Sequence, residues 1–210
     1  MIPGLAVDER LFQNLDLLNA EIIPIKWITP ILNESLANYA TRLSEQIDKT
    51  KPFYLIGVSF GGMCCLEITK AFGSIKTILI SSAKGQFDLP WYFKILRVIP
   101  MHRLLNDNFA KWLALNNKWL FGVKGKEQAA LFKDMLAKAP KDYPSRAVNC
   151  IVHWRNTVIP KNLIHIHGTK DRIIIFRNVK YPVPIKNGTH FMVMNNAEEI
   201  SKLVNEELNS

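Results

Sequence analysis

Cysteine is scarce in this chain, long apolar runs are missing, and the pattern of a secretory signal is not seen at its start. There are 3 cysteines among 210 residues, and two of them, Cys64 and Cys65, are adjacent, so the sequence holds no disulfide framework. No apolar run reaches the roughly 18 to 20 residues that a membrane-spanning helix needs. The start, MIPGLAVDER, lacks the basic and then apolar pattern of a secretory signal. These absences favour a protein of the reducing cytoplasm, and the sequence leaves open whether its true start lies upstream of Met1.

The motifs of several other function classes are also missing. The sequence has no Gly-x-x-x-x-Gly-Lys-Ser/Thr phosphate loop, no Gly-x-Gly-x-x-Gly after a strand and no His-Glu-x-x-His zinc motif. No nucleic-acid-binding motif accompanies the basic residues. Cys64 and Cys65 fall in a helical pattern, where small apolar residues pack rather than bind metal. We therefore expect no metal, no organic cofactor and no nucleic-acid partner.

Basic residues are in excess, and the excess is local. The chain carries 27 Lys and Arg against 18 Asp and Glu, a formal net charge of +9. Between Lys84 and Arg146 there are 12 basic and 5 acidic residues, so this segment alone has a surplus of +7. Such a segment can attract nucleic acid, anionic lipid or an acidic ligand, and it is equally compatible with a solvated face.

The pattern of apolar residues predicts an α/β fold with a mostly parallel sheet flanked by helices. Apolar runs rich in β-branched residues predict strands at 22–27, 53–58, 77–81, 163–167 and 179–186. Prolines in the last run place it near a sheet edge. Helices are predicted from Asn33 or Ser35, from Gly62 to Phe72, and at the chain's end, with Asn195 as cap and Glu198 as capping-box partner. Alternating strands and helices favour right-handed crossovers.

Residues from about 85 to 155 break this alternation and predict consecutive helices. Two apolar helix faces are expected, one of Leu104, Leu105, Phe109, Trp112 and Leu113, and one of Leu131, Phe132, Met135 and Leu136. A helical block between two strands of a parallel sheet is an insertion, and this one carries the basic surplus. We interpret residues 85–155 as a lid within a single domain of residues 1–210.

The sharpest signal is the run Gly57-Val58-Ser59-Phe60-Gly61, which follows an apolar strand and precedes a helix. This is Gly-x-Ser-x-Gly in the strand–turn–helix context that gives the motif its meaning. The serine must sit at the tip of a sharp, strained turn, where side chains two positions before and after it would collide. Gly57 and Gly61 meet that requirement, and Ser59 is the predicted nucleophile.

A serine nucleophile needs a general base, and the base needs an acid that orients it. In this topology the acid and the histidine follow the serine in the chain, each after a later strand. Asp171 follows the strand LIHIH by a few residues, and His190 lies in a glycine-containing loop before the last helix. His190 is therefore the predicted base, and Asp171 the residue that orients it.

The other histidines fit catalysis less well. His165 and His167 alternate in a strand and are expected to be structural, His153 to pack on an apolar helix, and His102 to be exposed. Asp8, after the first turn, is expected to cap a helix. Two backbone N–H groups are predicted to form an oxyanion hole, those of Phe60 and Leu5, with Gly4 allowing the tight bend before Leu5.

On these residues the sequence resembles the α/β-hydrolase superfamily. The matching segments are Pro3-Gly4-Leu5, Gly57-Val58-Ser59-Phe60-Gly61, His167-Gly168-Thr169-Lys170-Asp171 and Gly188-Thr189-His190-Phe191. The resemblance implies hydrolysis of an ester, thioester or amide through an acyl-enzyme, without metal or organic cofactor. Related proteins are often esterases, thioesterases or carbon–carbon hydrolases. The N-terminal strands common in the superfamily are missing or shortened here, so the fold is expected to be shortened at that end.

We therefore predict a serine hydrolase that acts on a small-molecule carboxylic ester or thioester. A narrower hypothesis makes the substrate an anionic thioester of coenzyme A or of an acidic carrier protein, attracted by the basic lid. A second class of hypothesis is a hydrolase fold used for binding without catalysis. A third is peripheral membrane association through the segment WYFKILRVIPMHRLL, which mixes bulky apolar and basic residues as interfacial helices do.

Overall fold

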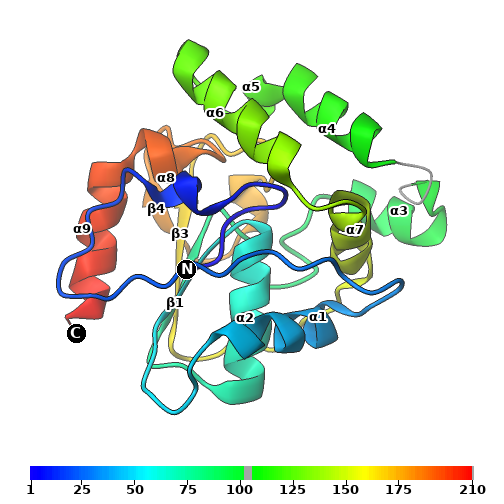
Figure 1. Ribbon diagram of the computed structural model, residues 1–210. Helices are drawn as coiled ribbons and strands as arrows, with labels where there is room; N and C mark the ends of the chain where they lie inside the picture. The colour runs from blue at the N-terminus through cyan, green and yellow to red at the C-terminus, as the bar shows by residue number, and fades with distance from the viewer. Residues whose placement is uncertain (102–105, 210) are drawn as a thin grey trace.

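The computed structural model describes residues 1–101 and 106–209, and within them the strands form one parallel sheet (Figure 1). The 4-stranded sheet has the order β1-β2-β3-β4, with strands β1 (Leu55–Val58), β2 (Thr77–Ile80), β3 (Leu163–Gly168) and β4 (Val183–Ile185). In register, Gly57 lies beside Leu79 and Leu79 beside His165. The predicted α/β class and the parallel sheet are confirmed.

The strand sequences match their places in the sheet. All residues of β1 and β2 are buried, because helices cover both faces, and their sequences are correspondingly apolar without alternation. In β4, Val183 and Pro184 are exposed and only Ile185 is buried. Proline lacks an N–H for the ladder, so a strand that contains it is tolerated at the edge of a sheet. Strand β4 lies at the edge, as predicted.

The predicted strand at 22–27 is wrong, although the segment lies close to the sheet. Residue Ile2 forms an isolated parallel bridge with Gly57, and the Ile25 N–H donates to the Met1 carbonyl at 2.9 Å. The segment is thus extended beside the start of the chain without forming a regular ladder. Pro3 has no N–H to donate, which prevents the pairing from continuing beyond the bonds made by Met1.

Helices flank the sheet on both faces. In Figure 1, α1 and α2 lie on one side of the strands and α9 on the other. Their bounds, with those of the short α8, are α1 (Leu36–Leu43), α2 (Phe60–Phe72), α8 (Met192–Asn195) and α9 (Ala197–Leu208). Helix α1 begins as expected, because the Ser35 side chain accepts from the Asn38 N–H, and Leu36, Tyr39 and Leu43 face the core.

The cap expected for the last helix is wrong by one residue. Asn196 holds the N-cap position of α9 and makes no side-chain cap bond, so the capping box with Glu198 does not form. Asn195 ends α8, and its amide is used elsewhere. It donates to the Gly122 carbonyl and accepts from the Gln128 amide, both at 2.9 Å. Tertiary contacts therefore take the side chain away from the local cap.

Consecutive helices occupy the chain between β2 and β3. They are α3 (Tyr92–Val98), α4 (Asp107–Asn116), α5 (Lys118–Phe121), α6 (Gly125–Lys138) and α7 (Tyr143–His153). We call residues 92–153 the insertion. Figure 1 shows α4, α5 and α6 above the end of the sheet where α8 begins. None of the helices in the described parts of the chain is long and apolar enough to span a bilayer.

The two apolar faces expected in the insertion have different outcomes. Phe132, Met135 and Leu136 of α6 are buried as expected. Phe109, Trp112 and Leu113 of α4 are largely exposed, and no described residue of that helix is buried. Leu104 and Leu105, predicted for the same face, lie outside the described residues. Helix α4 instead turns Ala110, Lys111 and Ala114 toward the interior, because that side of the helix meets a cavity rather than a packed core.

Short 3-10 helices complete the fold. They are η1 (Glu9–Phe12), η2 (Ser44–Gln46) and η4 (Phe176–Asn178). Asp8 caps η1 as expected, since its carboxylate accepts from the Arg10 N–H. The Arg10 guanidinium also bonds Asp134 of α6 at 2.7 Å, which links the first loop to the insertion. Burial raises the pKa of Asp8, but the hydrogen bonds and charge of Arg10 more than offset this and lower it below its usual value.

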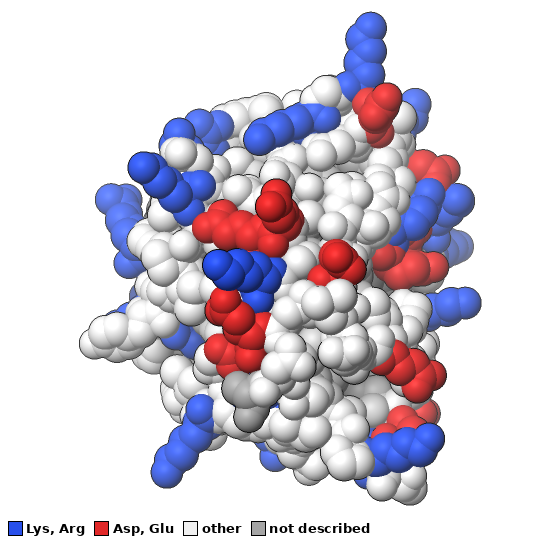
Figure 2. Space-filling model, turned by 90° about the vertical axis from the view of Figure 1, so that its left-hand side faces the viewer, with Lys and Arg blue, Asp and Glu red and all other residues white. Residues whose placement is uncertain are grey.

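Charge is distributed unevenly over the surface. Figure 2 shows the face formed by α9, where acidic side chains gather. The first turn of this helix alone carries Glu198 and Glu199, which suits the positive end of the helix dipole. The basic surplus lies instead between Lys84 and Arg146, in and next to the insertion.

Candidate active site

Ser59 occupies the turn between β1 and α2 in a strained backbone conformation. Its φ of 53° and ψ of −119° are rare for a residue with a side chain. A Cβ atom at Gly57 would lie 2.6 Å from the Gly61 carbonyl carbon, and one at Gly61 would lie 2.1 Å from the Pro3 oxygen. The steric reason expected for both glycines therefore holds. The turn projects the Ser59 side chain beyond the end of the sheet.

His190 and Asp171 meet Ser59 at this end of the sheet. The His190 Nε2 atom lies 3.0 Å from the Ser59 Oγ atom, and its Nδ1 atom lies 2.8 Å from Asp171 Oδ2. The other carboxylate oxygen of Asp171 accepts the N–H groups of Ile173 and Ile174 at 2.9 and 3.0 Å. Asp171 and His190 are both buried. The structure thus brings together the three side chains expected from the sequence.

Two further histidines lie behind Asp171. His167 Nε2 is 2.8 Å from the Ile174 carbonyl, so this nitrogen carries the hydrogen, and it also points toward Asp171 Oδ2 at 3.6 Å. His167 Nδ1 then accepts from His165 Nε2 at 3.1 Å. Burial lowers the pKa of both imidazoles, that of His165 well below its usual value. His167 thus donates its N–H to the loop that also carries the Asp171 carboxylate.

The sequence predicted a structural role for His165 and His167, and their burial agrees with it. The sequence does not predict the contact between His167 and Asp171, because alternation along a strand does not indicate which side chain meets the loop beyond it. His153 is exposed rather than packed, with its Nδ1 atom bonded to the Asn149 carbonyl in the preceding turn. His102 lies outside the described residues.

The first loop places backbone N–H groups near Ser59. Among the described residues, the Leu5 and Phe60 N–H groups donate no hydrogen bond, and Gly4, Leu5 and Ser59 line the same cavity. The tight bend depends on Ala6, which has a φ of 57°, rather than on Gly4 as expected. A Cβ atom at Gly4 would meet only ordinary contacts, the nearest at 3.5 Å. Leu5 therefore borders the cavity and Phe60 directly follows Ser59, and their role as oxyanion donors stays a prediction.

Trp27 fixes this loop, and no sequence motif marks it. Its indole N–H donates to the carbonyls of Val7 at 2.9 Å and Gly4 at 3.2 Å. Its ring packs against Phe60, which follows the serine, with centroids 5.4 Å apart. One side chain thus joins the first loop to the start of α2. Only the fold reveals this role, because the partners are distant in the chain.

A cavity of about 220 Å³ opens beside Ser59 and His190, and its walls are mostly apolar. Residues from the first loop, from α2 and from the insertion contribute, and the lining includes Leu5, Met63, Leu89, Phe93, Phe121, Phe132, Leu136, Val148, Ile151 and Phe191. Lys111 of α4 is the one charged side chain among the lining residues that the structure describes. Its ammonium donates to the Ala139 carbonyl at 3.3 Å, at the end of α6.

The insertion is joined to the loop of His190 through the end of α5. The Phe191 N–H donates to the Phe121 carbonyl at 2.8 Å, and the Asn195 amide donates to the Gly122 carbonyl at 2.9 Å. The Phe121 ring meets the His190 ring edge-on, with centroids 6.0 Å apart. We call these three contacts the α5 latch. It ties the position of the insertion to the position of the imidazole.

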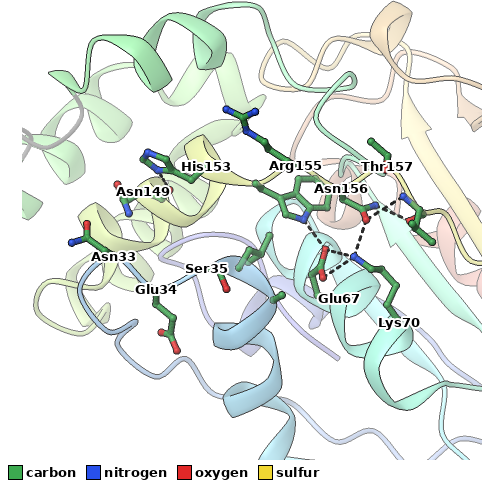
Figure 3. A pocket seen from close by; sticks show the side chains of 14 residues that line it. Asn33, Glu34, Ser35, Glu67, Lys70, Asn149, His153, Arg155, Asn156 and Thr157 are labelled. Atoms are coloured by element: carbon green, nitrogen blue, oxygen red, sulfur yellow. Dashed lines mark hydrogen bonds and ion pairs between the residues drawn. The ribbon is translucent and has the colours of Figure 1, made fainter.

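A second, larger hollow of about 510 Å³ lies between α1, α7 and residues 154–158 (Figure 3). Glu67, Lys70, Trp154 and Asn156 form a hydrogen-bonded network on its wall. Glu67 accepts from Lys70 at 2.9 Å and from the Trp154 indole at 2.7 Å, and Lys70 also donates to Asn156 at 2.8 Å. Neither Ser59 nor His190 lines this hollow. The network stabilises the junction of α2 with the chain leaving α7.

Nothing in the described residues points to a metal centre, since no three His, Cys, Asp or Glu side chains are grouped to hold an ion. Cys64, Cys65 and Cys150 are all buried as free thiols. Burial raises the pKa of each, to about 12 for Cys65 and Cys150. These thiols are therefore protonated packing groups at neutral pH.

Comparison with known proteins identifies the family. A family model described as "Alpha/beta hydrolase family" matches residues 27–203. An esterase from Thermogutta terrifontis has a TM-score of 0.69 at 15% identity, covering 99% of this chain and 88% of that one. A bromoperoxidase from Bacillus anthracis (TM-score 0.68, 13% identity, coverage 100% and 91%) and MenH from S. aureus (0.64, 16%, 99% and 91%) are also similar.

No curated protein matches the sequence. At these identities the solved structures establish the shared fold alone. The family match begins at Trp27, so the loop around Leu5 lies before it. It nevertheless spans Ser59, Asp171 and His190 and covers most of the chain. The protein is a member of the alpha/beta hydrolase family.

Proposed function

We propose that the protein is a serine hydrolase that cleaves a small-molecule carboxylic ester or thioester through an acyl-enzyme. One observation carries the proposal, the continuous series of contacts from Ser59 Oγ through both nitrogens of His190 to Asp171, at 3.0 and 2.8 Å. A serine hydroxyl is a weak nucleophile until a base within hydrogen-bond reach takes its proton. This arrangement supplies that base and the acid that orients it.

In the first half of the reaction Ser59 Oγ attacks the carbonyl carbon while His190 Nε2 takes the hydroxyl proton. Asp171 accepts a hydrogen bond from the Nδ1–H group of His190 and stabilises the imidazolium that forms. The carbonyl oxygen becomes an oxyanion, which accepts hydrogen bonds from the N–H groups of Leu5 and Phe60. His190 then returns the proton to the leaving alcohol or thiol, and the acyl group stays on the serine.

In the second half a water molecule takes the place of the leaving group. His190 accepts a proton from this water as it attacks the acyl carbonyl, and then returns the proton to Ser59 Oγ as the acid product departs. General-base assistance of this kind contributes about 10²- to 10⁴-fold to the rate. No step requires a group beyond the side chains and backbone named here.

The cavity supports a substrate with a compact acyl group. Its volume of about 220 Å³ lies below the roughly 300 to 1,000 Å³ of typical ligand pockets, and its walls are largely apolar. Short to medium acyl chains fill such a space without leaving voids. We further propose that the insertion acts as a lid within a single domain, because it supplies Phe93, Phe121 and Phe132 to the cavity wall.

The test is covalent labelling together with turnover. A fluorophosphonate probe should label the native protein at Ser59, and p-nitrophenyl esters of graded chain length should be hydrolysed. Ser59→Ala should lose both properties, and His190→Ala should lose turnover, with the thermal transition retained. Ser145→Ala is the matched control, because Ser145 lies on α7 and does not line the cavity. Absence of labelling at Ser59 would favour a non-catalytic binding protein with this fold.

A second candidate is hydrolysis of anionic thioesters, such as those of coenzyme A or an acidic carrier protein. The +7 surplus between Lys84 and Arg146 and the position of Lys111 on the cavity wall favour it. If charge attracts the substrate, kcat/KM for an acyl-CoA should fall steeply with added salt, whereas kcat/KM for a neutral ester should not. An equal salt response for both substrates would rule out this candidate.

A further inference from the structure

Helix α3 exposes apolar side chains that the rest of the protein leaves uncovered. None of its residues is buried. Val98 is 81% exposed and Trp91, just before the helix, is 68% exposed. We define the α3 surface as the large apolar residues on and beside this helix that are exposed, namely Trp91, Tyr92, Ile95, Val98, Ile99 and Met101. Such a concentration on a short segment differs from the isolated apolar residues that are common on protein surfaces.

Neighbouring chain segments extend this surface. The Gln86 N–H donates to the Asn156 carbonyl at 3.3 Å, which brings residues 86–87 beside residues 156–159. Phe87, Val158 and Ile159 of these segments are also exposed. Helix α3 is attached to the same region, because Arg97 donates to the Val152 carbonyl at 2.8 Å. The apolar side chains therefore belong to segments that pack together at one edge of the molecule.

Positive charge accompanies the apolar residues. Helix α3 contains Lys94 and Arg97 and no acidic residue. Arg155 follows α7 and is exposed, and Arg97 also donates to the Trp154 carbonyl at 3.2 Å. Burial and then the charge of Arg155 lower the pKa of Arg97, which indicates that the two guanidinium groups share one neighbourhood. This edge thus combines large apolar side chains with several cations.

We propose that the α3 surface docks on the surface of an anionic lipid bilayer. Tryptophan and tyrosine favour the boundary between lipid headgroups and acyl chains, and aliphatic side chains gain by entering it. Lysine and arginine beside them attract anionic headgroups. A face with apolar residues alone would suit another copy of the protein equally well. The accompanying cations oppose self-association and favour a negatively charged partner.

The docking surface has a direct connection with the catalytic cavity. Phe93, between Trp91 and Lys94 in the chain, lines the cavity beside Ser59. One short helix therefore faces the proposed bilayer with some side chains and the acyl site with another. A lipophilic ester dissolved in the membrane would meet the protein on the side where the insertion forms the cavity wall. This inference goes beyond the proposed hydrolysis and does not depend on it.

The test is binding to vesicles of defined composition. The protein is sedimented with phosphatidylcholine vesicles with and without about 30 mol% phosphatidylglycerol, at low and at high salt. The doubly substituted Trp91→Ser, Val98→Ser should weaken binding by about tenfold or more, since it removes the two most prominent apolar contacts. The doubly substituted Lys94→Glu, Arg155→Glu should abolish the preference for anionic vesicles.

The controls separate docking from folding and from catalysis. Phe72→Ser, which changes an apolar residue 44% exposed at the far end of α2, should bind vesicles like the native protein. Ser59→Ala should also bind normally, so that a failure of catalysis and a failure of docking can be told apart. All variants should keep the native thermal transition.

Two results would overturn the proposal. One is no binding to anionic vesicles by the folded native protein. The other is a concentration-dependent dimer in sedimentation velocity that the Trp91→Ser, Val98→Ser change dissociates, which would assign the surface to a second copy of the chain.

Discussion

Replacing Gly61 by alanine tests whether the first loop supplies an oxyanion donor. A Cβ atom at this position would lie 2.1 Å from the Pro3 oxygen and 2.3 Å from the Ile2 oxygen, where ordinary contact begins at 3.4 Å. Residues 2 and 3 would therefore have to retreat by about 1 Å. Pro3 is followed directly by Gly4 and Leu5, so the Leu5 N–H should retreat with them.

The expected magnitude follows from that displacement. Losing one oxyanion donor costs about 2.7 to 4 kcal/mol in the transition state, a drop in kcat of roughly 10²- to 10³-fold. The collision itself should lower the free energy of unfolding by about 1 to 3 kcal/mol. Ester turnover, normalised to folded protein, and urea unfolding measure the two effects separately. Activity should fall much further than the fraction folded.

Gly4→Ala is the matched control, since it adds the same methyl group to the same loop. Its nearest contact would be at 3.5 Å, and Gly4 has a conformation that alanine can adopt. We expect kcat to stay within about tenfold of the native value. Native-like turnover in Gly61→Ala, or a larger loss in Gly4→Ala than in Gly61→Ala, would refute the assignment of Leu5.

Three other predictions concern Asp171 and its surroundings. Asp171→Asn should lower kcat by about 10³- to 10⁴-fold in ester assays, and a silent change would mean that another acid orients His190. Because burial lowers the pKa of His165 and His167, only the unfolded chain takes up their protons near pH 6.5. Stability should therefore fall as pH drops from 7 to 5, by up to about 1.4 kcal/mol per pH unit for each imidazole, and His165→Gln should flatten the slope in urea titrations. Asn195→Ala, which removes one contact of the α5 latch, should cost about 1 to 3 kcal/mol and speed amide exchange in α5; unchanged exchange would count against the latch.

Several parts of the fold and the site could be predicted because their signals are local. The turn around Ser59 needs a small residue two positions before the serine and another two positions after it. This short spacing can be recognised directly in the sequence. Buried parallel strands need unbroken apolar runs, as in β1 and β2. Asp171 and His190 follow from the rule that parallel strands end at the same edge of a sheet.

Other features depend on contacts that no local pattern encodes. The segment 22–27 has the apolar content of a strand, but Pro3, which has no N–H, limits its pairing. Trp27 positions the first loop through bonds to Gly4 and Val7, and Asn195 gives up a helix cap for a contact with the insertion. In α4, the pattern of apolar residues indicates a face without indicating whether it meets a core, a cavity or solvent.

The α5 latch has a consequence for the order of events during turnover. The Phe191 N–H that donates to Phe121 belongs to the residue immediately after His190. A movement of α5 away from the His190 loop would break this hydrogen bond. It would also free the backbone that carries the His190 imidazole. If the insertion opens as the proposed lid, substrate entry and proton transfer by His190 would therefore exclude each other in time. The chemical step would then begin only after the bond between Phe191 and Phe121 has formed again.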